Sequence, residues 1–262
     1  MKNLGVIIEN KPKDFVAGTL PYEVLNPTGD WTVYLPTGEV QYSHYADSMA
    51  CVTFSCLNVL ETQYKFLTGR EINFSDRFIA KVSGTTQQGN SVQRVLDAIN
   101  TYGLVLEEDY PAPKDFTWDE YYSEIPPEIF AKANKTLKVA YEFHQPDSDF
   151  NKELKHVPFE MIIEKVNPYH SVEMANTSQE FDSYEPFLKP QKSIYITTKI
   201  ILKGVIMSNA QFVKKSGTNE YGFYLPAMSE DALKDKAFNL GINILNPDGS
   251  INYGSAKEVT GL

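Results

Sequence analysis

The segment 47–55, Asp-Ser-Met-Ala-Cys-Val-Thr-Phe-Ser, constrains the fold most, because it predicts the start of a helix with a cysteine in its first turn. Ser48 is a favourable N-cap, since its hydroxyl can accept a hydrogen bond from an otherwise unpaired backbone N–H. Counted from Ser48, Cys51 falls at the third helical position, where the helix dipole favours thiolate over thiol. This placement suits a nucleophile, although most buried cysteines are inert core residues.

The residues that follow predict a long buried helix and an α+β chain. Apolar side chains recur with helical spacing as far as Leu67, and Thr68-Gly69 ends the helix. One long helix, then smaller helices, then strands is an α+β order rather than alternating βαβ units. The further strands expected are Leu4–Ile8, Trp31–Leu35, Leu137–Phe143, Phe159–Glu164, Tyr195–Val205 and Tyr221–Leu225, and the further helices are Ser75–Lys81, Ser91–Tyr102, Pro127–Asn134 and Ser229–Leu240.

The composition changes after about residue 207, which predicts a main domain at 1–206 and a small appended α/β module at 207–262. The module offers a surface for a docking partner. The stretch 111–127, rich in Pro, Trp and Tyr, predicts an irregular segment at the surface or beside a cleft.

Charge and cysteine content exclude several classes of protein. The chain has 262 residues with a net charge of −10, and this acidity argues against nucleic acid as a partner. No apolar run is long enough for a signal peptide or a membrane span, so we expect a cytoplasmic protein with no membrane partner. Cys51 and Cys56 point in different directions on one helix, which fits a reducing compartment. No spacing of Cys and His predicts a metal site, and we expect no cofactor.

A cysteine nucleophile needs a base, and the base needs a group that orients it. The chain offers four histidines, His44, His144, His156 and His170. Only His170 is followed, at the distance of a loop and a strand, by a candidate orienting group, Asp182. Each residue alone is more often a structural histidine or a turn aspartate, so the combination and its order carry the prediction.

At this point the sequence resembles the papain-like cysteine peptidases, over about residues 30–205. Segment 50–55, Ala-Cys-Val-Thr-Phe-Ser, is similar to the family's Ser-Cys-Trp-Ala-Phe-Ser around the nucleophile. His170-Ser-Val resembles the family's His-Ala-Val, and Asp182-Ser-Tyr resembles its Asn-Ser-Trp. The segments 67–69, 73–76, 88–90, 98–104, 108–111 and 154–163 resemble the family's intervening motifs in the same order. The nearest relatives are expected among papain-fold proteins of tailed bacteriophages.

The resemblance implies a two-lobed fold, with the cysteine helix in a helical lobe and His170 in an antiparallel β-barrel-like lobe. It further implies Cys51 as nucleophile, His170 as proton shuttle and Asp182 as orienting group. Gly89, with Asn90, resembles the family's glycine that binds the substrate backbone, although a plain turn fits Gly89 equally well.

The main departure concerns the oxyanion donor. The family uses a Gln six residues before the cysteine, and this position is Tyr45 here. Gln41, ten residues before Cys51, can serve only if the loop carries an insertion of four residues. An amide N–H aimed at the oxyanion is often worth about 3 kcal/mol, so its absence would weaken catalysis. Val52 also replaces Trp, Met49 replaces Gly, and Asp182 replaces Asn.

Three functions compete on these observations. The first is a cysteine peptidase that cleaves peptide or protein substrates through a thioester acyl-enzyme. The second keeps the fold but cleaves the peptidoglycan cross-link, as phage lysis enzymes do. The third is a non-catalytic phage assembly protein on a papain-like scaffold. If the protein is encoded by a phage, we expect it in the host cytoplasm or the virion. Residues 1–40 lack the long charged helix of the family's inhibitory propeptides, so we expect no such segment.

Overall fold

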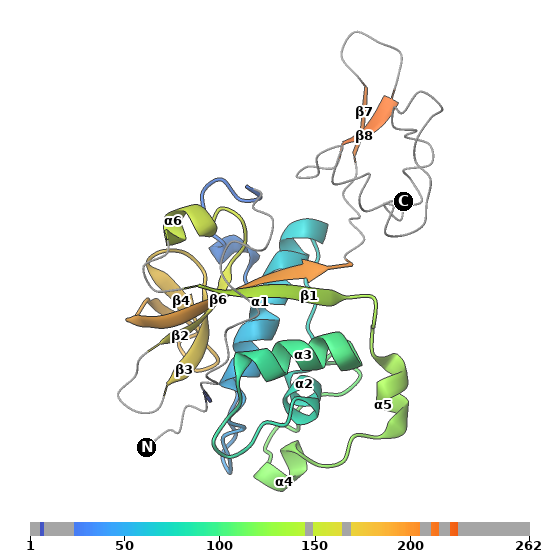
Figure 1. The fold of residues 1–262 in the computed structure, drawn as a ribbon. Helices are drawn as coiled ribbons and strands as arrows, with labels where there is room; N and C mark the ends of the chain where they lie inside the picture. The colour runs from blue at the N-terminus through green and yellow to red at the C-terminus, as the bar shows by residue number, and fades with distance from the viewer. Residues whose placement is uncertain are drawn as a thin grey trace. The chain divides into compact units, whose positions relative to one another are not determined.

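A helical part that begins with Cys51 precedes an antiparallel sheet, which gives an α+β fold (Figure 1). The computed structural model describes residues 6–7, 24–144, 149–163, 169–204, 211–214 and 221–224. The helices are α1 (Cys51–Thr68), α2 (Asp76–Val82), α3 (Val92–Tyr102), α4 (Trp118–Tyr121), α5 (Pro127–Lys132) and α6 (Phe150–Glu153), with a short 3-10 helix η1 (Thr32–Tyr34).

The six-stranded sheet has the order β1-β6-β2-β3-β4-β5, and every neighbouring pair is antiparallel. Its strands are β1 (Lys138–His144), β2 (Phe159–Ile163), β3 (His170–Met174), β4 (Gln179–Phe181), β5 (Leu188–Pro190) and β6 (Ile194–Lys203). Strands β2 and β3 are buried at every position, because both faces of this part of the sheet are covered.

One face of β2 and β3 is apolar and forms the core around Trp31. Phe159, Met161 and Ile163 alternate along β2, and Val172 and Met174 stand opposite them on β3. The indole N–H of Trp31 donates to the Leu154 carbonyl at 2.7 Å.

The opposite face carries polar side chains and meets α1. The hydroxyls of Ser55 on α1 and Ser171 on β3 are 2.5 Å apart. Further along the helix, the Gln63 amide donates to the Ile200 carbonyl at 2.8 Å and accepts from the Leu202 N–H at 3.1 Å. The serine pair holds the cysteine helix against β3, the strand that begins with His170, and the Gln63 bonds hold the helix against β6.

The helices of the other lobe begin and end as expected from their caps. The hydroxyls of Ser75 and Ser91 accept the N–H groups of Phe78 and Arg94 at the starts of α2 and α3. Gly103 ends α3 with a φ of 85°, a conformation that favours glycine.

The structure corrects two local predictions. Residues 31–35 are not a strand, because the Asp30 carboxylate accepts the backbone and hydroxyl protons of Thr32 and turns the chain into η1. Helix α1 begins at Cys51, so this residue is the first helical residue rather than the third after an N-cap at Ser48. The preceding Met49 has a φ of 58°, which keeps the chain out of the helical conformation there.

Several elements were missed or lie outside the described residues. Strands β4, β5 and β7 and the short helix α4 were not expected, whereas residues 168–174 and 152–157 had been interpreted only as a possible strand start, now β3, and a helix end, near α6. The expected strand Leu4–Ile8 is described only at residues 6–7, and the expected helix Ser229–Leu240 lies wholly outside the described residues.

The chain divides into two units, one of Met1–Phe66 with Arg70–Gly204, the other of Leu67–Gly69 with Val205–Leu262. The second contains a hairpin of β7 (Gln211–Lys214) and β8 (Tyr221–Tyr224). Since most of 207–262 lies outside the described residues, the appended α/β module remains a prediction. Over the described ranges, no helix has the length and apolarity needed to cross a membrane.

Candidate active site

Cys51 lies at the N-terminus of α1, next to the first residues of β3. Its side chain is fully buried, and its thiol accepts a hydrogen bond from the backbone N–H of Ser171. Ser171 directly follows His170, so the first residue of the helix meets the first residues of the strand. The sequence predicted Cys51 and His170 as catalytic residues, and the structure brings their segments together from positions 119 residues apart.

His170, the first residue of β3, and Asp182, which directly follows β4, form a buried pair. Nε2 of His170 is 2.7 Å from Oδ1 of Asp182, and neither side chain is exposed. Because a carboxylate can only accept, the ring donates from Nε2, and Nδ1 carries the lone pair when the ring is neutral. This is the tautomer a general base at Nδ1 requires.

Asp182 is held as an anion by more than its histidine. Nζ of Lys189 on β5 is 2.7 Å from its Oδ2, and the backbone N–H of Tyr184 donates to Oδ1 at 3.2 Å. Burial opposes ionisation of this carboxyl, but the bonds from His170 and Lys189 outweigh it and hold its pKa well below the usual range. Lys189 was not predicted from the sequence, because it reaches the site through the pairing of β4 with β5.

The Cys51 thiol rests in surroundings that disfavour the thiolate. Burial raises the pKa of the Cys51 thiol, the N–H of Ser171 lowers it, and the carboxylates of Asp47, Asp182 and Glu160 raise it further. The position at a helix N-terminus therefore does not produce a thiolate by itself. Attack by this sulfur requires transfer of its proton to a base.

Gln41 reaches the cysteine loop because residues 43–46 form a tight turn. Tyr42 and Asp47 form an antiparallel bridge, and the Ser43 N–H donates to the Ala46 carbonyl at 2.7 Å. The Ser48 N–H then donates to the Gln41 carbonyl at 3.0 Å. The turn has four residues, the length of the insertion expected from the sequence, and the role of Gln41 as an oxyanion donor stays a prediction.

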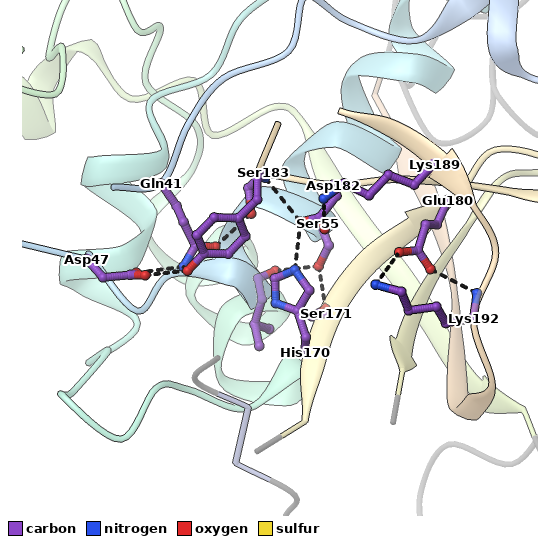
Figure 2. A network of polar contacts seen from close by, with 12 residues as sticks. Gln41, Asp47, Ser55, His170, Ser171, Glu180, Asp182, Ser183, Lys189 and Lys192 are labelled. Atoms are coloured by element: carbon purple, nitrogen blue, oxygen red, sulfur yellow. Dashed lines mark hydrogen bonds and ion pairs between the residues drawn. The ribbon is translucent and has the colours of Figure 1, made fainter. Parts of the chain in front are cut away.

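The Gln41 side chain is fully buried in a polar network, shown in Figure 2. Its Nε2 donates to Oδ1 of Asp47 at 2.8 Å and to the hydroxyl of Tyr184 at 3.0 Å. Its Oε1 accepts from the hydroxyl of Ser183 at 2.7 Å. The Tyr184 hydroxyl also donates to Asp47. Both N–H groups of Gln41 are thus engaged, and sequence reasoning had missed Asp47 and Tyr184 as partners.

The predicted substrate-binding residues lie between α2 and α3. Gly89 has a φ of 93° and forms a bridge with Thr86, so a turn that favours glycine is present. Asn90 is fully buried, and its amide donates to the hydroxyls of Ser83 and Thr85. The Asn90 carbonyl accepts the Ile7 N–H at 2.7 Å, and Val6 pairs with Asn90 as a parallel bridge. Ile7 of the N-terminal segment therefore contacts the backbone of a residue that was predicted to bind substrate.

The other histidines lie in different surroundings. His44 lies in the 43–46 turn, and its ring meets the exposed ring of Tyr45. Nε2 of His144 is 2.9 Å from Glu142 on the same strand, and burial beside Lys199 lowers the pKa of His156 to about 4. Across the described residues, no group of three or more His, Cys, Asp or Glu side chains is arranged to bind a metal ion.

Comparison with solved structures identifies the fold. A procathepsin B from Trypanosoma congolense matches with a TM-score of 0.52 and 11% identity, covering 76% of this chain and 86% of that one. Xylellain, a cysteine protease from Xylella fastidiosa, matches with a TM-score of 0.50 and 14% identity over 78% of this chain and 96% of that one. The proform of the ragweed pollen cysteine protease Amb a 11 matches with a TM-score of 0.51 and 14% identity, covering 72% and 69%.

The fold is that of the papain-like cysteine proteases. No protein-family profile matches the sequence, and no curated protein matches it. The three structures come from a trypanosome, a bacterium and a plant, so the bacteriophage relationship inferred from the sequence stays a prediction.

Proposed function

We propose that this protein is a cysteine peptidase that hydrolyses peptide bonds through Cys51, His170 and Asp182. The observation that carries the proposal is the buried bond between His170 and Asp182, next to a cysteine at a helix N-terminus in a papain-like fold. A histidine held in one tautomer by a carboxylate, beside a cysteine, is the arrangement that activates a thiol nucleophile.

The chemistry follows from these groups. Nδ1 of His170 takes the proton from the Cys51 sulfur as the sulfur attacks the carbonyl carbon, and the carbonyl oxygen becomes an oxyanion. The backbone N–H of Cys51 and the Gln41 amide are the proposed donors to that oxygen. His170 then protonates the leaving amine as the C–N bond breaks, which leaves a thioester. Water, deprotonated by His170, hydrolyses the thioester and restores the thiol.

Asp182 serves this cycle by position and charge. It accepts the Nε2–H of His170 throughout and stabilises the imidazolium that forms after proton transfer. Lys189 and the Tyr184 N–H keep its carboxylate ionised and oriented. Asp182 can therefore orient the imidazole of His170, which is the role of Asn in the family.

Covalent labelling tests the proposal, and the second free cysteine provides a matched control. Both Cys51 and Cys56 are buried on α1 and form no disulfide. A peptide carrying a thiol-reactive electrophile should label the wild type and Cys56→Ala at one site, and should leave Cys51→Ala unlabelled. Equal labelling of the wild type and Cys51→Ala would overturn the proposal.

A non-catalytic scaffold is the second candidate, and three observations favour it. The Cys51 side chain is fully buried, both N–H groups of Gln41 are engaged, and the Asn90 carbonyl is occupied by Ile7. This candidate predicts a wild type that neither cleaves peptides nor accepts the peptide electrophile. Its partner would be a protein bound by another surface, for which 207–262 is the candidate module.

A further inference from the structure

We propose that Asp47 is a positioning residue that fixes the orientation of the Gln41 amide, so that its nitrogen rather than its oxygen faces the reacting carbonyl. The inference rests on the proposed peptidase function and goes beyond it, because no catalytic role follows for Asp47 from the family resemblance.

A glutamine amide can exchange its oxygen and nitrogen by a rotation, and its neighbours decide which orientation is stable. Two neighbours of Gln41 do not select an orientation of its amide, since the hydroxyls of Ser183 and Tyr184 can each donate or accept a hydrogen bond. The Asp47 carboxylate can only accept. An amide turned the other way would place its oxygen against this carboxylate, in a site with no exposure to water. Asp47 is therefore the group that selects the orientation.

Asp47 is itself held firmly. Its Oδ1 accepts the Met49 backbone N–H at 2.9 Å as well as the Gln41 amide at 2.8 Å, and its Oδ2 accepts the Tyr184 hydroxyl. Met49 is two residues before Cys51. The carboxylate thus ties the amide of Gln41 directly to the loop that carries the nucleophile, as Figure 2 shows for its side-chain partners.

The second N–H of Gln41 is the one available for catalysis. It donates to the neutral hydroxyl of Tyr184 at 3.0 Å. An oxyanion accepts a hydrogen bond more strongly than a neutral phenol does, so it can displace Tyr184 as acceptor. The bond to Asp47 meanwhile keeps the amide in place. No covalent bond of Asp47 changes at any step.

Tyr184 connects Gln41 and Asp47 with the second pair of site residues, His170 and Asp182. Its ring lies 5.5 Å from the His170 ring, and its N–H donates to Asp182. The family has Trp at this position, and an indole can donate but cannot accept from Gln41 while it donates to Asp47. The arrangement of Asp47, Gln41 and Tyr184 therefore belongs to this chain.

The test uses Asp47→Asn, since an amide can present either oxygen or nitrogen and no longer selects one orientation of Gln41. We expect kcat on a peptide amide substrate to fall at least about tenfold, with KM changed by less than about threefold, because only the transition state loses a donor. Alkylation of Cys51 by iodoacetamide forms no oxyanion. Its rate should be unchanged or higher, because a carboxylate that disfavours the thiolate is removed.

Two controls distinguish a lost orientation of the Gln41 amide from a general destabilisation of the fold. Asp97→Asn makes the same change at the carboxylate that accepts the Tyr141 hydroxyl at 2.8 Å, and should alter neither rate. In a Gln41→Ala background, Asp47→Asn should lower kcat by no more than about twofold, since its effect acts through Gln41. Thermal unfolding of each variant reports whether the fold is intact.

The outcomes are distinct. A loss of kcat with retained alkylation, abolished in the Gln41→Ala background, supports the proposal. A wild type that is active and an Asp47→Asn variant with unchanged kcat would overturn it, as would equal losses in hydrolysis and alkylation. A wild type that alkylates at Cys51 but neither cleaves peptides nor accepts a peptide electrophile would overturn the proposed function, and this inference with it.

Discussion

Nε2 of His170 lies 2.7 Å from Oδ1 of Asp182, and neither side chain is exposed to solvent. We expect Asp182→Ala to lower kcat/KM at least about tenfold, because the imidazole loses the acceptor that fixes its tautomer. Asp182→Asn keeps an oxygen for the Nε2–H and should lose less. Steady-state hydrolysis of a peptide substrate measures both variants. Activity of Asp182→Ala equal to that of the wild type would show that this pair has no role in turnover.

The pH dependence of stability follows from two buried carboxyls on the face of the sheet that meets α1. Glu160 and Glu173 stand opposite each other on β2 and β3. Burial raises the pKa of Glu160 to about 7, despite the hydrogen bond from the Ser171 hydroxyl, and it raises the pKa of Glu173 to about 8. Cys51 and Cys56 of α1 are near Glu160, and Glu61 of α1 is near Glu173.

Both folded-state pKa values exceed the unfolded value of about 4.3, so the protonated carboxyls favour the folded state. The stabilisation of the folded state by these two protonated carboxyls is fully present below the unfolded pKa. It is lost as the pH rises through the folded-state pKa values of about 7 for Glu160 and about 8 for Glu173. We expect the free energy of unfolding in urea to fall by roughly 1–3 kcal/mol per carboxyl between pH 6.5 and 9. Glu160→Gln should reduce the slope, whereas the exposed Glu124→Gln should not. A stability that rises over this range would contradict the assignment.

Met49 offers a test of the loop before the nucleophile. Its φ of 58° costs an L-residue about 1–2 kcal/mol that glycine does not lose. Met49→Ala and Met49→Gly both remove the buried side chain, so comparing them isolates the backbone. Glycine should be the more stable variant by about 1 kcal/mol in urea unfolding, the reverse of the usual order. A more stable alanine variant would show that this backbone conformation is not adopted in solution.

The N-terminal contact predicts an effect on substrate affinity. If the Ile7 N–H competes with substrate for the Asn90 carbonyl, Ile7→Pro removes the donor, and one such bond is worth about 1 kcal/mol. We expect KM for a peptide substrate to fall by about two- to fivefold with kcat unchanged. Ile7→Val keeps the N–H and should behave as the wild type. An unchanged KM in Ile7→Pro would mean that substrate does not use this carbonyl.

Local patterns predicted much of the helical part and three strands of the six-stranded sheet. The cysteine helix, α2, α3, β1, β2 and β6 were all indicated by periodicity and caps. For β3 the sequence indicated that residues 168–174 can begin a strand, but alternation of polar and apolar residues predicts one buried face, whereas both faces are buried. Its Ser171 and Glu173 face α1, a contact between segments distant in sequence. Trp31 likewise suggested a strand, whereas the Asp30 side chain turns the chain.

The candidate site likewise combines residues that local sequence indicated with residues that meet only through contacts distant in sequence. Order and spacing indicated Cys51, His170 and Asp182, and the structure brings their segments together; their catalytic roles remain proposals. The partners of Gln41 could not be predicted, since Asp47 and Tyr184 are 137 residues apart and meet only when the lobes are assembled. Lys189 joins Asp182 for a similar reason, through the antiparallel return of β5.

Trapping the thioester tests most directly whether Cys51 is the nucleophile of a peptidase. The protein is mixed with an activated ester of a short peptide, quenched in acid within the first turnover, digested, and analysed by mass spectrometry. We predict the mass of the acyl group on the peptide that contains Cys51 in the wild type, and no such adduct in Cys51→Ala. An ester that acylates the wild type elsewhere, or not at all, would contradict the claim that Cys51 is the nucleophile of a peptidase.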